Sequence, residues 1–101
     1  MLTVSVVVTL RLIGTHSLKE KRAVIRSLIE RLRARHRLAA AEVGLQDDVR
    51  QAEIGFAAVS GEAATARAQA ENALRFIDDR VIGRAEVIET RVDEFSPGEE
   101  R

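Results

Sequence analysis

The spacing of apolar residues switches between a strand repeat and a helix repeat along this chain, and the order of these switches constrains the fold most. The segment from Leu2 to Leu12 alternates apolar and polar residues, which is typical of a strand with one buried face. A helix is then predicted from Ser17 to about His36, because apolar residues recur every three or four positions and Glu20 completes a capping box with Ser17. The chain therefore opens with a strand and a helix.

The same two patterns recur in the rest of the chain. Residues 38–46 and 51–60 each favour a strand, and the polar run between them predicts a hairpin. Residues 62 to about 80 show helical spacing, with Ser60 or Gly61 as the entry, and residues 85–95 favour a last strand. This order predicts an α+β ferredoxin-like βαββαβ sandwich, a four-stranded antiparallel sheet with two helices on one face and the first and third strands central. We expect a single ferredoxin-like domain over residues 1–96 and a frayed tail at residues 97–101.

Composition excludes several classes of protein. The chain has 101 residues, of which 46% are hydrophobic and 32% charged, as is typical of one small globular domain. No apolar run approaches the roughly 20 residues that span a membrane, so we expect a cytoplasmic protein. There is no cysteine, and His16 and His36 stand at opposite ends of one predicted helix. We therefore expect neither a metal site nor a cofactor.

Positive charge is concentrated near the N-terminus although the net charge is zero. Residues 1–37 hold nine Lys or Arg against two Glu, a surplus of +7 that residues 38–101 balance with −7. The first helix carries what we call the basic stripe, five outward positions at helical spacing: Lys19, Arg22, Arg26, Arg33 and Arg37. Lys21, Arg31 and Arg35 widen it. One alternative is a solvated helix neutralised by its neighbours in the fold, with Arg26 pairing locally with Glu30.

This density of positive charge favours phosphate binding, because neutralised phosphates release counterions and arginine binds their oxygens bidentately. The leading hypothesis is a non-enzymatic RNA- or ribosome-associated protein. Its predicted contacts to phosphate backbones are Lys19, Lys21, Arg22, Arg26, Arg33 and Arg37. The second hypothesis is a homo-oligomeric interaction module or a small-ligand regulatory module, in which the basic helix meets the acidic half of a partner subunit.

The start of the first helix is a second candidate anion site. Its N–H groups would favour one bound anion near His16 and Ser17, although Ser17 is expected to cap the helix. A local hydrogen-bonding role is the alternative for His16. The adjacent carboxylates at 47–48 and 78–79 are better explained by turn formation than by acid–base catalysis. We predict no catalytic residue.

The sheet face away from the helices is expected to be flat and apolar. If Ile54 and Phe56 point to the helices, the first and third strands show no aromatic residue on this face, which disfavours stacking of RNA bases. Small apolar side chains such as Val7, Ala57 and Val59 favour packing against a second copy related by two-fold symmetry. We therefore expect a homodimer through the open sheet face, with simple exposure of this face as the alternative.

Four runs, GTHSLKEKRAVIRSLIERLRARH, AEVGLQD, AEIGFAAVS and NALRFID, resemble in order and spacing the YlxP-like family of small uncharacterised bacterial proteins. The resemblance covers nearly the whole chain, and the SLKEKR start at Ser17 is its most specific part. It implies a ferredoxin-like fold and no known reaction. It also implies an association with translation, because genes of this family often neighbour those for an initiation factor and a ribosome-binding factor. Members commonly carry His and Trp where this chain has Leu45 and Val49.

Overall fold

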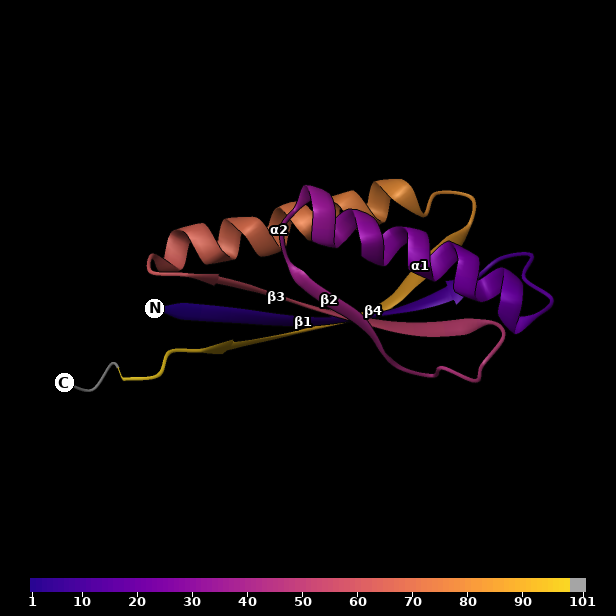
Figure 1. Ribbon diagram of the computed structural model, residues 1–101, viewed down its shortest axis with the longest axis horizontal. Helices are drawn as coiled ribbons and strands as arrows, with labels where there is room; N and C mark the ends of the chain where they lie inside the picture. Colours follow the sequence, from indigo (N-terminus) through magenta and orange to yellow (C-terminus); the bar gives the residue numbers. More distant parts are fainter. Residues whose placement is uncertain (99–101) are drawn as a thin grey trace.

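The fold is the predicted βαββαβ sandwich (Figure 1). The computed structural model describes residues 1–98. Its elements are β1 (Leu2–Leu12), α1 (Leu18–Arg35), β2 (Ala39–Gly44), β3 (Gln51–Ser60), α2 (Ala63–Arg80) and β4 (Ala85–Phe95). The four strands pair antiparallel in the order β2-β3-β1-β4, so β1 and β3 are central as predicted. Pro97 and Gly98 form a turn, and the rest of the predicted tail, 99–101, lies outside the described residues.

The core lies between the sheet and the two helices. Every even-numbered residue of β1 from Leu2 to Leu12 is buried, and so is every even-numbered residue of β3 from Ala52 to Ala58. The helices add two apolar rows: Ile25, Leu28, Ile29 and Leu32 from α1, and Ala66, Ala70, Ala73 and Ile77 from α2. Full burial of one Val, Leu or Ile side chain stabilises the fold by about 1.5–3 kcal/mol. A one-residue slip of β1 would turn its whole buried row to the other face, so the alternation fixes the register.

The two helices have the same length but different N-termini. The Ser17 side chain accepts the Glu20 N–H at 3.1 Å and caps α1 as predicted. The N-cap of α2 is Glu62 rather than the expected Ser60 or Gly61, and its side chain makes no capping hydrogen bond. Neither α1 nor α2, the helices of the described residues, is long and apolar enough to cross a membrane.

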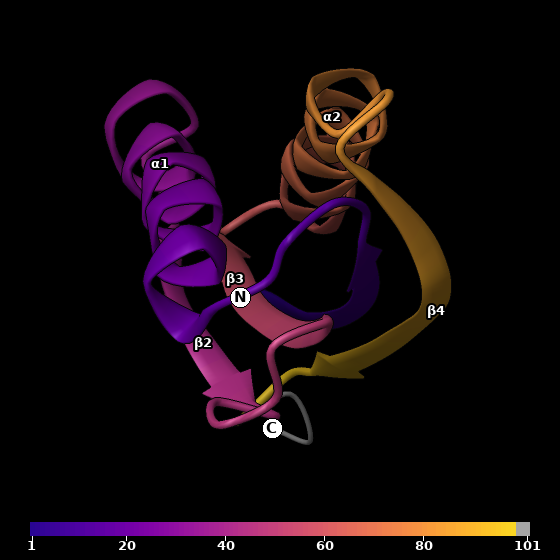
Figure 2. The same ribbon diagram turned by 90° about the vertical axis from the view of Figure 1, so that its right-hand side faces the viewer.

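The helices cover the sheet unevenly. α1 packs on β2, α2 packs on β1 and β3, and β4 lies to the side of α2 (Figure 2). β4 pairs with β1 along its length, with a bulge at Ile88 between the Thr9–Glu89 and Leu10–Val87 pairs. Ten of the eleven residues of β4 are exposed, so α2, which reaches this strand through the Arg67–Glu94 ion pair, leaves most of it uncovered.

Candidate nucleic-acid interface

The basic stripe lies on the flank of α1 that faces the edge strand β2. Arg22, Arg26 and Arg33 border a groove of about 600 Å³ between α1, β2 and the loop that follows β2. Lys19 is exposed in the first turn of α1, and Arg37 is exposed just after the helix, with a left-handed φ of 55°. The structure therefore brings three of the predicted residues to one groove and leaves two at the ends of the same helix.

Carboxylates also border this groove. Glu30 lies on the α1 side between Arg26 and Arg33, while Asp47 lies on the side of the loop. No ion pair joins Glu30 to Arg26 or Arg33 in residues 2–98. The local Arg26–Glu30 pairing considered from the sequence is therefore not formed. Glu30 divides the stripe into a group of three bases near the start of α1 and a pair near its end.

The exposed bases of α1 are not neutralised by ion pairs within the fold. Four ion pairs form among residues 2–98: Arg11–Glu86, Lys21–Glu42, Arg67–Glu94 and Arg91–Glu53. Only one of them involves α1, and it uses a buried lysine. The helix holds seven Lys or Arg against two Glu. Without the buried Lys21, six Lys or Arg stand against two Glu, and no ion pair within residues 2–98 neutralises these six.

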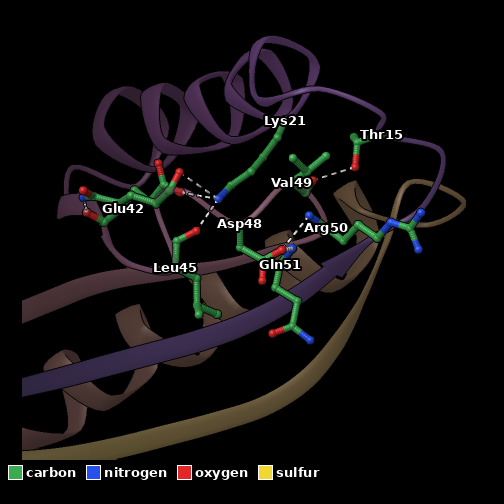
Figure 3. A network of polar contacts seen from close by, with 9 residues as sticks. Thr15, Lys21, Glu42, Leu45, Asp48, Val49, Arg50 and Gln51 are labelled. Carbon is green, nitrogen blue, oxygen red and sulfur yellow. Dashed lines mark hydrogen bonds and ion pairs between the residues drawn. The ribbon is translucent and has the colours of Figure 1, made fainter.

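Lys21 is not part of the outward surface, and the prediction that it widens the basic stripe is wrong. Its side chain is 0% exposed, and its Nζ donates to the carbonyls of Leu45 at 2.6 Å and Gln46 at 3.4 Å (Figure 3). The ammonium also lies 3.1 Å from Oε2 of Glu42. That oxygen accepts no hydrogen bond from the described residues, so the attraction between the two groups is chiefly ionic. A buried ammonium is tolerated when its charge and its N–H donors are both matched, as here.

The sequence does contain a signal for the burial of Lys21. It precedes Ile25 by four residues and Leu28 by seven, so it lies on the apolar row of α1 rather than on the basic stripe. Its partner Glu42 was missed altogether, because it lies 21 residues along the chain at the end of β2. Lys21 ties the first turn of α1 to the β2–β3 loop, and the conspicuous SLKEKR motif is therefore largely structural.

The β2–β3 loop is held by further hydrogen bonds. Asp48 accepts the N–H groups of Arg50 at 2.8 Å and Gln51 at 2.9 Å, and these bonds hold the pKa of the Asp48 carboxyl below its usual value. The Thr15 hydroxyl donates to the Val49 carbonyl at 2.9 Å (Figure 3). The loop that forms one wall of the groove is therefore fixed to both the start of α1 and the start of β3.

The second candidate anion site is already occupied by a side chain of this protein. Glu20 Oε1 accepts the His16 N–H at 2.8 Å and the Ser17 hydroxyl at 3.4 Å. The carboxylate thus binds the His16 N–H instead of the Ser17 N–H expected from the capping box. Because a second anion would meet this carboxylate, we leave His16 and Ser17 out of the interface.

The other histidine has a packing role. The His36 ring lies against Phe76, with 4.9 Å between ring centroids, and joins the end of α1 to α2.

No three His, Asp or Glu side chains of residues 1–98 are grouped so that they could hold a metal ion.

The open sheet face carries the predicted small apolar residues on its central strands, but Glu53 of β3 also lies there, in an ion pair with Arg91 of β4. Val7, Gly55, Ala57 and Val59 alternate with buried residues and lie away from the helices, and β2 adds Ala39, Ala41 and Val43 to the same face. Phe95 of β4 pairs with Thr3 and adds one exposed aromatic ring at the end of the sheet. One terminal ring does not make the row of aromatic side chains on which RNA-recognition sheets stack bases.

Residues 3–92 match the protein family described as "Protein of unknown function (DUF503)". The chain belongs to the DUF503 family. It is 35% identical over 75 residues to the uncharacterized protein YlxP of Bacillus subtilis (strain 168). The aligned segment covers 69% of this chain and 82% of that relative. The resemblance to YlxP-like proteins is therefore confirmed.

Solved structures show the same fold as this DUF503 domain. It superposes on a protein described as a chlorite dismutase with a TM-score of 0.58 and 10% identity, over 95% of this chain but 45% of that one. The de novo designed protein Foldit4 (TM-score 0.51, 14% identity) and HapK from Hahella chejuensis (TM-score 0.50, 14% identity) match over more than nine-tenths of both chains. At these identities the likeness shows the fold alone, so a function for this DUF503 protein has to be argued from its own surface.

Proposed function

We propose that this protein is a non-enzymatic RNA-binding protein, associated with ribosomal RNA, that contacts phosphate backbones through the basic stripe on α1. The observation that carries the proposal is that the stripe is exposed and takes no part in the ion pairs of residues 2–98. Lys21, His16 and Ser17 are left out because each serves a structural contact, whereas Arg33 is kept because it is exposed, although its Nε donates to the carbonyl of Ala40.

The shape of the stripe supports a polyanion rather than a small anion. From Lys19 to Arg33 it follows α1 for about 21 Å, longer than one phosphate group. Arg22 and Arg26 are one turn apart on the same flank, and guanidinium groups bind phosphate oxygens bidentately. A backbone running along α1 would meet several of these groups in turn.

The composition of the site favours binding by shape and charge rather than by base sequence. The stripe and its groove contain no aromatic side chain on which bases would stack. Double-stranded RNA is recognised mainly through its phosphates and 2′-hydroxyl groups. We therefore expect affinity for structured RNA with little preference for sequence and a strong dependence on salt.

The test measures binding of a fluorescent hairpin taken from ribosomal RNA by anisotropy at about 50 mM salt, where phosphate contacts are strongest. The double variant Arg22→Glu/Arg26→Glu should weaken binding by about 100-fold, because two attractive contacts become repulsive. Its matched control is Arg75→Glu/Arg80→Glu, which makes the same change in net charge at exposed positions of α2. The control should bind within about threefold of the unmodified protein.

Two outcomes would overturn the proposal. One is an unmodified protein that does not bind structured RNA at low salt. The other is an equal loss in the two double variants, which would mean that net charge rather than the stripe on α1 governs binding.

A further inference from the structure

The two edges of the sheet are built differently. At the β2 edge, Arg33 Nε donates to the carbonyl of Ala40 at 2.9 Å, and Gln46 Nε2 donates to the carbonyl of Glu42 at 3.1 Å. Side chains therefore bind outward carbonyls of this six-residue strand. Such coverage is a common way to prevent another strand from pairing with a sheet edge.

The β4 edge lacks this protection in the described chain. β4 has eleven residues, and its side chains make no hydrogen bond to its own backbone among residues 2–98. It exposes four apolar side chains between residues 87 and 95: Val87, Ile88, Val92 and Phe95. A long, exposed and partly apolar edge strand is a template for pairing with another strand.

We infer that β4 pairs antiparallel with β4 of a second copy of this chain, so that two sheets join edge to edge about a two-fold axis at Val92. The segment Glu89–Phe95 pairs with β1 in unbroken register on one side, and its other side is the free edge of the sheet. Val92 is its central residue and is 55% exposed. With the axis at Val92, all seven residues of this segment oppose residues of the second copy.

Charge complementarity selects this register. Placing Val92 on the axis puts Arg91 opposite the partner's Asp93 twice, once on each side of the axis, and brings the two Val92 side chains together. Arg91 and Asp93 both lie on the open face, since they pair with Val7 and Ser5 of β1. Within one copy the Arg91 guanidinium already lies 3.1 Å from Oε2 of Glu53, so the partner's Asp93 would share this guanidinium with Glu53. Charges of opposite sign on directly opposite residues stabilise the pairing of two strands.

The neighbouring registers are disfavoured. An axis at Arg91 would place the two Arg91 side chains opposite each other and Glu89 opposite the partner's Asp93, so that like charges would face each other. An axis at Asp93 would oppose the two Asp93 carboxylates. An axis at Thr90 would bring the bulge at Ile88 into the paired segment and break the ladder.

The same pairing would cover an apolar groove beside α2. This groove of about 270 Å³ has an apolar floor of Val4, Val6, Ala70, Leu74 and Val92, and its remaining lining residues are the charged Arg67, Glu71 and Glu94. Within one copy α2 leaves most of β4 exposed, whereas in the edge-to-edge dimer each β4 would gain the other β4 as a neighbour and the two α2 helices would flank the pair. The open sheet face would remain free on both copies.

The test uses the absence of cysteine from the chain, which makes any introduced cysteine unique. Val92→Cys should form a disulfide-linked dimer on mild oxidation, because residues on the axis of an antiparallel pair lie about 5.5 Å apart or less. Ala57→Cys, on the open face, should stay monomeric on denaturing gels. It serves as the probe for the face-to-face dimer expected from the sequence.

A charge swap tests the register on the same protein by light scattering and sedimentation. Asp93→Arg should weaken the dimer by about tenfold, because two attractive pairs become repulsive. The double variant Arg91→Asp/Asp93→Arg, made in a Glu53→Gln background because Glu53 would otherwise repel the carboxylate introduced at position 91, should recover most of that loss, with folding checked by circular dichroism. A monomer at every concentration, efficient cross-linking by Ala57→Cys but not by Val92→Cys, or no rescue in the double variant would each overturn the inference.

Discussion

α1 and α2 hold equivalent places in the fold but differ in charge. Both have 18 residues and pack on the same face of the sheet (Figure 1). α1 carries seven Lys or Arg against two Glu, whereas α2 carries three Arg against Glu71, Asp78 and Asp79. Because α2 packs without any surplus charge, the surplus on α1 is not a requirement of helix–sheet packing, which is one reason why we propose a polyanionic partner for it.

The two helices are also anchored differently. α2 approaches the sheet through the small side chains of Ala66, Ala70 and Ala73. α1 is fixed in addition by polar contacts, the Ser17 cap and the buried Lys21. These contacts hold the start of the basic stripe in a defined position relative to the β2–β3 loop.

The largest effect on stability is expected at Lys21. Lys21→Ala leaves Glu42 without its ammonium partner and removes two hydrogen bonds to the loop, so the free energy of unfolding should fall by about 3 kcal/mol. Lys19→Ala, in the same motif but exposed, should change it by less than about 0.5 kcal/mol. Urea unfolding measures both. Equal stability of the two variants would remove the distinction between the buried anchor and the exposed stripe.

The helix caps should give a smaller and opposite pair of effects. Ser17→Ala removes the side-chain cap of α1 and should destabilise the protein by about 1 kcal/mol. Glu62→Ser supplies a capping hydroxyl that α2 lacks and should stabilise it by about 0.5 kcal/mol. Thermal unfolding of the two variants checks the signs. A loss of stability in Glu62→Ser would show that the end of β3 needs Glu62 for another reason.

The smallest effect concerns the pairing of α2 with β4. The hydrogen bonds from Arg67, at 2.8 and 2.9 Å, lower the pKa of the Glu94 carboxyl in the folded state. A lowered pKa means that this group contributes to stability above its unfolded pKa, and that the contribution is lost as the pH falls through the folded value. Between neutral and acid pH, the melting temperature of the Glu94→Gln variant should fall slightly less steeply than that of the unmodified protein. Identical acid limbs for both proteins would mean that the pair adds nothing to stability.

The element order could be predicted from the sequence because each element has its own period and its own boundary. The even-numbered residues of β1 and the cap at Ser17 are local signals, and they are found where they were expected. The solvent exposure of β4 could not be predicted in this way. Its apolar residues Val87 and Val92 are typical of a half-buried strand, and only the lateral position of α2 leaves them uncovered.

The candidate site was predicted less well than the fold. Lys21 was predicted to lie on the surface because it is charged, although its spacing to Ile25 and Leu28 indicated the buried row of α1. Its acceptors, Glu42 and the Leu45 carbonyl, come from the β2–β3 region, and no local pattern connects them to α1. The five residues of the basic stripe are exposed, because outward spacing on a helix depends only on the helical repeat, while their role in binding stays a prediction.

The salt dependence of RNA binding tests most directly whether the charge surplus of α1 serves a partner. The logarithm of the binding constant would be measured against the logarithm of the salt concentration for three proteins: the unmodified chain, Arg22→Gln/Arg26→Gln on α1, and Arg75→Gln/Arg80→Gln on α2. We predict that the slope of this plot is smaller by about two for the α1 variant and unchanged for the α2 variant. All three proteins should be equally stable in urea. Equal slopes for the unmodified chain and the α1 variant would contradict phosphate binding by the basic stripe.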